Sequence, residues 1–329
     1  MTANNLSAVA QAIRGPFQQF AQEFEPLRPE LYRYCRYLTR TPWDAEDLVQ
    51  DTMVRAFTLL GTSHTAPVHP KAWLFRVASN RWLNMCKQRR EEPHAELREA
   101  AHTPLDPKAT REAAGSLVVG LAPRERAALV LKEVFDFSLE EIAETLFTTV
   151  GGVKSALNRA RGKVKEPDWS GQEVAPPAVL NEFCSAFNAR DLDRVVSLLL
   201  ETVEIELSGT FVDSGVDVAK RSFGGLMFAT KMAMEAGIPS GHREGLQPVA
   251  PRFELRMHRG EPIVLTFWKH DDGEHVRGLS LIAAEGAQIT RIKTYMHSPE
   301  LLAEVCKELG ETFRSNGYRN WETQTSSVS

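Results

Sequence analysis

Apolar residues recur at helical spacing in two short stretches near the middle of the chain. Ser138 followed by Glu141 is a capping box, which predicts that a helix begins after Ser138. Thr149 is the expected N-cap of a second helix. The predicted buried sides of the two helices consist of Leu139, Ile142, Ala143 and Leu146, and of Val150, Val153, Leu157 and Ala160.

The second helix carries a polar, positively charged face, and no acidic residue occurs from Val150 to Lys165. Such a face suits the major groove, because Lys and Arg hold phosphates while Asn, Ser or Arg reach base edges. The pattern predicts a helix-turn-helix that reads duplex DNA; the alternative is a solvated basic face on a helical bundle. The expected contacts are Lys154, Ser155, Asn158, Arg159, Arg161 and Lys163.

Two further amphipathic helices are predicted upstream, from Asp44 to about Leu60 and from Pro70 to Arg90. The first opens on an acidic turn, which the helix dipole favours. From Lys71 to Arg90 there are basic residues and no acids, with Trp and Phe side chains between them. Interleaved cations and aromatic rings are typical of proteins that bind single-stranded nucleic acid. Trp73 and Trp82 have apolar neighbours and are expected in the core.

The C-terminal part changes from helices to alternating strands. Its predicted elements are a helix over 179–187, a helix over 194–200, a strand over 203–207, a helix over 219–236, and strands over 253–257, 263–268, 276–284 and 289–295. A polar turn is expected between His270 and His275, and Gly286 is expected in a hairpin. Helices followed by a curved antiparallel sheet predict an α+β cone.

Composition limits the possible functions. The chain has 329 residues and a net charge of −4, which argues against a nonspecific nucleic-acid coat and favours two or three domains. The four cysteines lie far apart, so neither zinc nor a disulfide framework is expected. No metal or other cofactor is predicted. No apolar run approaches the ~20 residues of a membrane span, and no signal-peptide pattern is present, so a cytoplasmic location without membrane association is expected.

Proline-containing polar stretches suggest the domain boundaries. The expected organisation is a flexible arm over 1–22, a helical domain over 23–92, a flexible linker over 93–114, the helix-turn-helix domain over 115–166, a linker over 167–177, the α+β domain over 178–310 and a tail over 311–329. The fold class is therefore multi-domain, with two all-α domains followed by an α+β domain.

The two helical domains resemble regions 2 and 4 of an extracytoplasmic-function (ECF) type bacterial sigma factor of the sigma-70 family. The strings that carry the resemblance are Asp44-Ala-Glu-Asp-Leu-Val-Gln-Asp-Thr, Ala72-Trp-Leu-Phe-Arg-Val-Ala-Ser-Asn, Ile142-Ala-Glu-Thr-Leu and Val153-Lys-Ser-Ala-Leu-Asn-Arg-Ala-Arg. Each string is short, but their order, with a polar linker between them, is specific. The resemblance implies a transcription initiation factor, not an enzyme.

The resemblance also implies partners for these helices. Core RNA polymerase is the expected protein partner, through its β′ clamp helices and its β flap, and promoter DNA is the nucleic-acid partner. The minus-thirty-five element would be read by the helix-turn-helix, and the loop from Gly61 to Pro70 would capture an unstacked base of the minus-ten element. The expected minus-ten contacts are Arg76, Asn80, Arg81, Asn84 and Lys87, and the expected polymerase contacts are Asp44, Glu46, Asp47, Gln50 and Asp51. A solvated acidic helix face is the alternative for the latter set.

The chain departs from the family pattern at four positions. Phe147 stands where the turn usually carries Gly, Gly152 where Thr is common, Ala156 where Arg is common, and Asn84 where Asp is frequent. A bulky residue in a left-handed turn is disfavoured, and the pair of glycines weakens a helix. These departures predict modest intrinsic affinity of the helix-turn-helix for DNA.

Residues 187–199 resemble the opening of SnoaL-like domains of the NTF2-like superfamily, which implies a fused regulator. The alternative function is a SnoaL-like small-molecule-binding or isomerase/cyclase-type domain fused to a DNA-binding regulator. Acid–base candidates for that alternative are Asp213, His242, His258, His270, His275 and His297. An unknown small-molecule ligand could lie among Phe211, Phe223, Met227, Phe267 and Trp268, whose spacing also fits an ordinary core.

Overall fold

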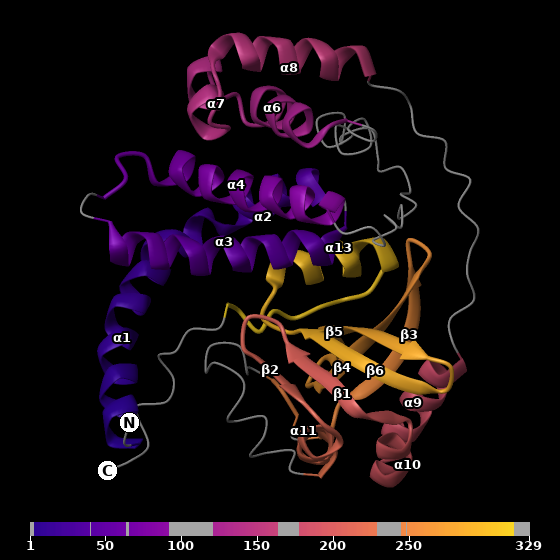
Figure 1. The fold of residues 1–329 in the computed structure, drawn as a ribbon. Helices are drawn as coiled ribbons and strands as arrows, with labels where there is room; N and C mark the ends of the chain where they lie inside the picture. Colours follow the sequence, from indigo (N-terminus) through magenta and orange to yellow (C-terminus); the bar gives the residue numbers. More distant parts are fainter. Residues whose placement is uncertain are drawn as a thin grey trace. The chain divides into compact units, whose positions relative to one another are not determined.

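The structure is a computed structural model, and it describes residues 3–39, 41–63, 66–91, 121–163, 178–228, 245–247 and 249–318. The chain divides into two compact units, Met1–Ser170 and Gly171–Ser329 (Figure 1). The two linkers predicted over 93–114 and 167–177, His242, and the second half of the helix predicted over 219–236 lie outside the described residues.

The first unit opens with a group of helices built on leucine and aromatic side chains. Leu31, Leu48 and Leu74, one from each of three helices, are fully buried. Thr41 caps the third helix by accepting a hydrogen bond from the Asp44 amide at 3.1 Å. The helices are α1 (Ala3–Phe24), a short 3-10 turn (Glu25–Leu27), α2 (Arg28–Thr39), α3 (Pro42–Thr62) and α4 (Pro70–Glu91).

Helix α1 replaces the flexible arm that was expected over residues 1–22. Its phenylalanines recur at helical spacing and pack on α3 and α4. The Phe17 and Phe20 rings lie 5.2 and 5.5 Å from the Phe57 ring, and Phe24 lies 5.8 Å from Trp73. Burial of this aromatic stripe stabilises the helix despite the proline inside it.

The helix-turn-helix is confirmed as α7 (Leu139–Thr145) and α8 (Val150–Lys163), preceded by α6 (Pro123–Glu133). The Ser138 hydroxyl accepts from the Glu141 amide at 3.1 Å, and the Glu141 carboxylate accepts from the Ser138 amide at 2.7 Å, which completes the predicted capping box. The Gly152 amide donates to the Thr149 hydroxyl at 3.0 Å. Both predicted caps are therefore present.

The helix-turn-helix packs on the first group of helices through a buried contact. The Arg126 guanidinium of α6 donates to the Leu38 carbonyl at 2.7 Å. Phe135 packs edge-on against Tyr34 and Phe75, with ring centroids 5.7 and 5.0 Å apart. Phe137 stacks on Phe75 at 5.7 Å. The two predicted helical domains thus share an aromatic interface within one compact unit.

The second unit is a mixed sheet with helices, which confirms the predicted α+β fold. Its helices are α9 (Ala178–Asn188), α10 (Leu192–Ser197), α11 (Val216–Phe228) and α13 (Pro299–Leu309). The strands are β1 (Leu199–Leu207), β2 (Phe211–Ser214), β3 (Arg252–His258), β4 (Glu261–His270), β5 (Gly273–Glu285) and β6 (Gln288–Tyr295), in the order β2-β1-β6-β5-β4-β3 (Figure 1).

Two details of this sheet differ from the prediction. Strand β1 pairs with β6 in parallel, so the sheet is not purely antiparallel. In the strand order β6 lies between β1 and β5, and it runs in the same direction as β1. The helix predicted over 194–200 also ends earlier, because Leu199 already begins β1.

The core of the second unit lies between one face of the sheet and the helices α9 to α11. The Phe187 and Phe253 rings stack 3.6 Å apart, and Phe223 packs edge-on against Phe187. Helix α13 contacts β5, and its Glu308 bonds to His258 of β3 at 2.8 Å. The predicted turns at 270–275 and Gly286 are both present.

The segment after α13 continues the sheet beside β5 where β6 has ended. The Val276 amide donates to the Thr312 carbonyl at 2.9 Å, and the Arg314 amide donates to the Val276 carbonyl at 3.0 Å. Asn316 donates to the carbonyls of Arg277 and Met296. Residues 311–318 therefore belong to the folded unit rather than to the predicted tail; 319–329 lie outside the described residues.

Candidate nucleic-acid interface

The first half of α8 presents a polar surface to solvent. Lys154, Ser155 and Asn158 are all exposed, while Val153 and Leu157 are buried on the opposite side. In helix-turn-helix proteins the N-terminal residues of the second helix contact base edges. This half of α8 therefore has the side chains and the exposure that base reading requires.

The second half of α8 is held by acidic residues of α6. The Glu125 carboxylate accepts from Arg159 Nε and from Lys163 Nζ, both at 2.9 Å, and Glu133 accepts from Arg161 at 2.7 Å. Burial opposes ionisation of Glu125, but the hydrogen bonds from Lys163, Arg159 and the Ala122 amide lower its pKa overall. The Glu125 carboxylate therefore fixes the orientation of the Arg159 and Lys163 side chains, which are two of the predicted DNA contacts.

The turn between α7 and α8 keeps a left-handed residue without glycine. Phe147 has φ of 49° and is 65% exposed. The Thr148 amide closes the end of α7 by donating to the Ala143 carbonyl at 2.9 Å. At Gly152, an added Cβ would lie 2.5 Å from the Thr148 hydroxyl, so Thr148 would have to move for a larger residue to fit.

Ala156 is buried, and this changes the meaning of its departure from the family pattern. Its exposed fraction is 7%, and it lies on the inward side of α8. In this chain the position is therefore part of the core. The missing arginine at this position gives no reason to expect modest affinity for DNA.

The basic stripe of α4 is only partly open to solvent. Asn84 and Lys87 are exposed, and Asn80 is half-buried. Arg76 forms an ion pair with Glu144 of α7, and Arg81 forms one with Asp51 of α3 at 2.7 Å. Arg81 and Asp51, which were predicted to bind different partners, therefore bind each other in this structure.

The acidic face of α3 contains one residue that the prediction placed wrongly. Glu46 is fully buried, where it pairs with Arg28 and accepts from Gln50 at 2.9 Å. It stabilises the packing of α2 on α3 and cannot reach a partner protein. Asp51 is exposed, whereas Asp44 and Asp47 are half-buried.

Two charged residues that sequence reasoning missed organise this region. The Arg126 guanidinium lies 5.7 Å from the Trp82 ring, beneath the predicted strand-binding helix. Glu125 stands three residues after Ala122 at the start of α6 and accepts its amide at 3.2 Å. This capping spacing is the signal in the sequence that points to Glu125, but it does not reveal the pairing of Glu125 with α8.

Two of the histidines considered as acid–base candidates bond to other side chains. His258 contacts Glu308, and His275 contacts Thr312 and Asp272 at 3.0 and 3.1 Å. Asp213 lies on the exposed edge strand β2. Within the described residues, no cluster of three or more His, Cys, Asp or Glu side chains could hold a metal ion.

The aromatic residues considered for a ligand pocket have separate environments. Phe211 is 42% exposed, whereas Phe223 and Met227 belong to the core beside α9. The Phe267 ring lies under the Arg252 guanidinium at 4.3 Å. Phe223, Met227 and Phe267 therefore fit the core alternative that the sequence left open, whereas Phe211 does not.

Comparison with known families gives two matches in the first unit. Sigma-70 region 2 matches residues 24–92, and Sigma-70 region 4 matches residues 111–164. The chain is 30% identical to the ECF sigma factor SigG of Mycobacterium tuberculosis over 217 residues, which cover 54% of this chain and 58% of SigG. It is 30% identical to SigM of the same species over 165 residues, which cover 49% of this chain and 83% of SigM.

Solved structures include proteins similar to each unit. The crystal structure of M. tuberculosis SigJ is 24% identical, covers 85% of this chain and 97% of SigJ, and has a TM-score of 0.31. An NTF2-like protein of unknown function from Cytophaga hutchinsonii is 10% identical, covers 40% of this chain and 92% of its own, and has a TM-score of 0.24. These low TM-scores support no inference about function.

The sequence matches settle the family. They span less than two thirds of SigG but more than four fifths of SigM. In the described part of the chain, no helix has the length and apolar character needed to cross a membrane. The chain belongs to the extracytoplasmic-function sigma factors of the sigma-70 family.

Proposed function

We propose that this protein is a transcription initiation factor that binds core RNA polymerase and directs it to promoters with two recognition elements. The observation that carries the proposal is the exposed set Lys154, Ser155 and Asn158 on α8, in a unit that also contains the basic helix α4. A factor with this activity would work in the cytoplasm.

The two DNA-facing helices have different parts in this proposal. Helix α8 reads the minus-thirty-five element as duplex through Lys154, Ser155 and Asn158, while Arg159, Arg161 and Lys163 bind phosphates once they leave the acids of α6. Helix α4 holds the melted minus-ten strand through Asn80, Asn84 and Lys87, and through Arg76 and Arg81 once they leave their acidic partners.

The acidic face of α3 is proposed to contact the β′ clamp helices of polymerase through its solvent-accessible residues. These are the exposed Asp51 and the half-buried Asp44, Asp47 and Gln50, whereas Glu46 is fully buried and takes no part. The second unit is proposed to regulate this activity rather than to catalyse a reaction. Support comes from Glu308, which contacts His258 and accepts from Arg259, so that this histidine is part of the packing of α13 on the end of β3.

Run-off transcription from the promoter upstream of the gene tests this proposal. Full-length protein with core polymerase should yield a defined transcript, and comparison with the 1–166 fragment gives the direction of regulation. Absence of any transcript with either protein would contradict the proposed function.

Duplex binding tests the role of α8 separately. Lys154→Ala should lower affinity for the minus-thirty-five duplex. It should also reduce the slope of log affinity against log salt concentration by about one, which corresponds to one lost phosphate contact. Lys220→Ala, which changes an exposed lysine of α11, is the matched control and should leave both quantities unchanged. Equal effects of the two substitutions would show that α8 is not the reading helix.

A further inference from the structure

Three basic side chains of α4 are each held by a carboxylate from a different helix. The pairs are Lys71 with Glu30 of α2, Arg76 with Glu144 of α7, and Arg81 with Asp51 of α3. A carboxylate in such a pair occupies the cation that a phosphate would otherwise bind. A nucleic-acid strand must therefore compete with these acids for the cations of α4.

Asp51 differs from the other two acids because it lies on the surface proposed for polymerase. Glu30 belongs to α2 and Glu144 to α7, whereas Asp51 is on the acidic face of α3 that is assigned to the β′ clamp helices. The Asp51 side chain is 47% exposed, so a second molecule can reach it while it contacts Arg81. The Asp51–Arg81 ion pair thus joins the proposed polymerase surface to the proposed strand-binding surface.

Two nitrogens of the Arg81 guanidinium contact the same oxygen of Asp51. Nε lies 2.8 Å and Nη2 lies 2.7 Å from Oδ2. A carboxylate accepts hydrogen bonds on both of its oxygens, so a cation of another protein can approach Oδ1 before Arg81 leaves. Asp51 can therefore exchange one cation for another without first losing its charge partner.

Arg81 can reach the strand-binding surface of α4 by a change in its own side chain. Asn84, an exposed candidate for strand contact, stands three residues later, a spacing that makes two side chains neighbours on a helix. The Arg81 side chain is 32% exposed, and rotamer changes of exposed side chains are fast. The planar guanidinium can bind a phosphate through two parallel hydrogen bonds, which leaves Asp51 to another cation.

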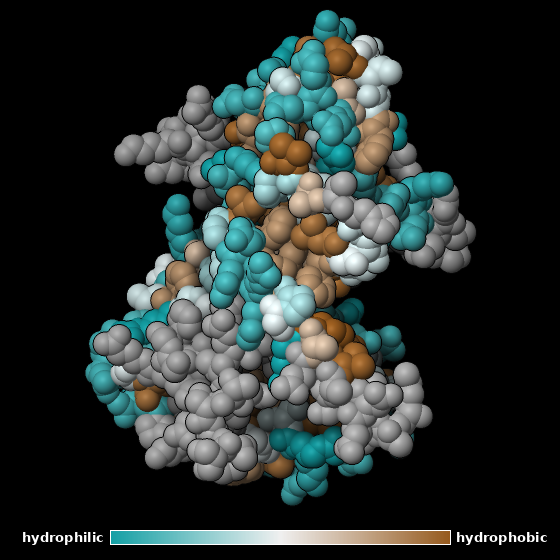
Figure 2. Space-filling model, turned by 90° about the vertical axis from the view of Figure 1, so that its left-hand side faces the viewer, coloured by the Kyte–Doolittle hydropathy of each residue, from teal (hydrophilic) through white to brown (hydrophobic). Residues whose placement is uncertain are grey.

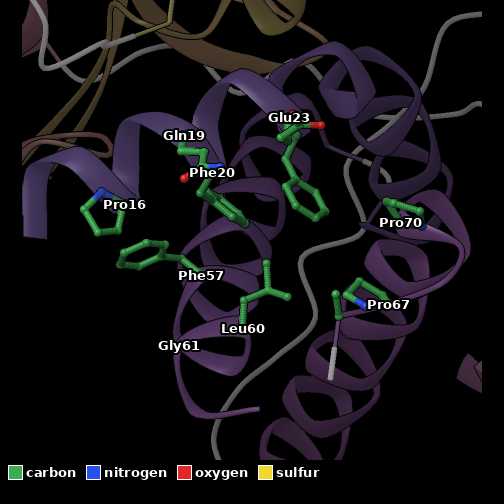
Figure 3. A pocket seen from close by; sticks show the side chains of 11 residues that line it. Pro16, Gln19, Phe20, Glu23, Phe57, Leu60, Gly61, Pro67 and Pro70 are labelled. Carbon is green, nitrogen blue, oxygen red and sulfur yellow. The ribbon is translucent and has the colours of Figure 1, made fainter. Parts of the chain in front are cut away.

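Helix α1 braces the end of the α3–α4 pair that carries the connecting loop. The Phe20 ring of α1 packs on Phe57 of α3. Figure 3 shows this contact beside a pocket of about 480 Å³ whose other side is formed by Pro67 and Pro70. Figure 2 shows apolar side chains together near the middle of the face turned to the viewer. Because apolar packing fixes this end, breaking one surface ion pair between α3 and α4 leaves the two helices in place.

We propose that Asp51 couples polymerase binding to promoter-strand binding: a basic side chain of polymerase takes the Asp51 carboxylate, and the released Arg81 binds a phosphate of the melted strand beside Asn84. The coupling is reciprocal, so a strand that takes Arg81 frees Asp51 for polymerase. This inference rests on the proposed function, which assigns the two residues to separate partners. It adds that their ion pair makes one binding event depend on the other.

The test measures binding of a single-stranded minus-ten oligonucleotide by the full chain alone and by holoenzyme assembled with saturating core polymerase. An exposed ion pair changes an equilibrium by up to about fivefold. Asp51→Asn should therefore raise the affinity of the full chain alone about three- to fivefold, because Arg81 is released at the start. The affinity of holoenzyme should stay at the wild-type value, since polymerase has already taken Asp51. The gain should disappear when Arg81→Gln is added to Asp51→Asn.

Glu182→Gln is the matched control. Glu182 of α9 forms a surface ion pair with Arg194, and the two side chains are 45% and 50% exposed, which is similar to the Asp51–Arg81 pair. The substitution removes one negative charge, as Asp51→Asn does, but it lies outside the first unit. Affinity for the oligonucleotide should therefore be unchanged, both in the full chain alone and in holoenzyme.

The outcomes separate the inference from the proposed function. If Asp51→Asn raises the affinity of the full chain no more than Glu182→Gln does, the ion pair does not restrain Arg81, and the inference is overturned even with normal run-off transcription. An equal gain in the full chain and in holoenzyme would also overturn it, because polymerase would then not have released Arg81. Absence of wild-type transcription would instead refute the proposed function itself.

Discussion

Replacing Glu46 with alanine is expected to weaken the first group of helices through the charge left behind on Arg28. The Glu46 side chain is fully buried and that of Arg28 is 7% exposed, so water cannot replace the lost carboxylate. Gln50 would lose its acceptor as well. Removing one partner of a buried ion pair costs about 3–5 kcal/mol. The equilibrium constant for opening of these helices should therefore rise about 150- to 4,000-fold, because each ~1.4 kcal/mol changes it tenfold.

Reaction of Cys35 with a thiol reagent measures this opening in the full-length protein. Cys35 of α2 is fully buried, and burial raises the pKa of its thiol well above the usual range, so it reacts only when α2 separates from its neighbours. Mass spectrometry of the labelled peptides reports each cysteine separately. Cys184 and Cys306, which are buried in the second unit, provide an internal reference whose rates should not change.

Asp51→Ala is the matched control on the same helix. Asp51 is 47% exposed and pairs with Arg81 near the surface, so its loss should cost no more than about 1 kcal/mol and change Cys35 labelling less than about fivefold. If Glu46→Ala also changes the rate less than about fivefold, the buried pair does not hold α2 on α3, and the reasoning is refuted.

Three further substitutions test other parts of the structure. Phe147→Gly should stabilise the protein by about 1 kcal/mol, because glycine relieves the left-handed conformation and the exposed ring loses little burial; a urea midpoint that falls would contradict this. Thr149→Ala should cost about 1 kcal/mol through the lost cap of α8, measured in the same way, and no change would show that the cap is dispensable. Burial opposes ionisation of Glu308, but hydrogen bonds from His258 and Arg259 lower its pKa to about 2, so its stabilising effect is present above pH ~4.5 and is lost as the pH falls toward 2. Glu308→Gln should therefore flatten the acid dependence of the urea midpoint of the second unit in that window, and an unchanged profile would argue against the His258–Glu308 contact.

Local sequence signals predicted the helices of the recognition motif because their determinants lie within a few residues. The capping box at Ser138 and the cap at Thr149 were both present as expected. The burial of Glu46 also follows from local spacing. The helical period that turns Ala45 and Val49 inward turns Glu46 inward as well.

Other features depend on residues far apart in the sequence. The pairing of Arg76 with Glu144 joins positions 68 residues apart, and no spacing rule predicts it. The parallel pairing of β1 with β6 depends on the path of the chain through the intervening elements. Helix α1 was missed because Gly15 and Pro16 disfavour a helix locally, while its aromatic contacts with Phe57 favour one. Tertiary packing decided each of these cases.

The strand-like segment after α13 affects the order in which the two units can fold during synthesis. Asn316 bonds to the fully buried Arg277 and to the Met296 carbonyl, and Thr312 and Arg314 pair with Val276. Residues 312–316 leave the ribosome after all six strands of the sheet, and long after α4 and α8. A nascent chain can therefore fold its first unit while the sheet of the second unit still lacks this strand-like segment. A chain that stops before residue 312 would have an intact first unit and an incomplete second unit.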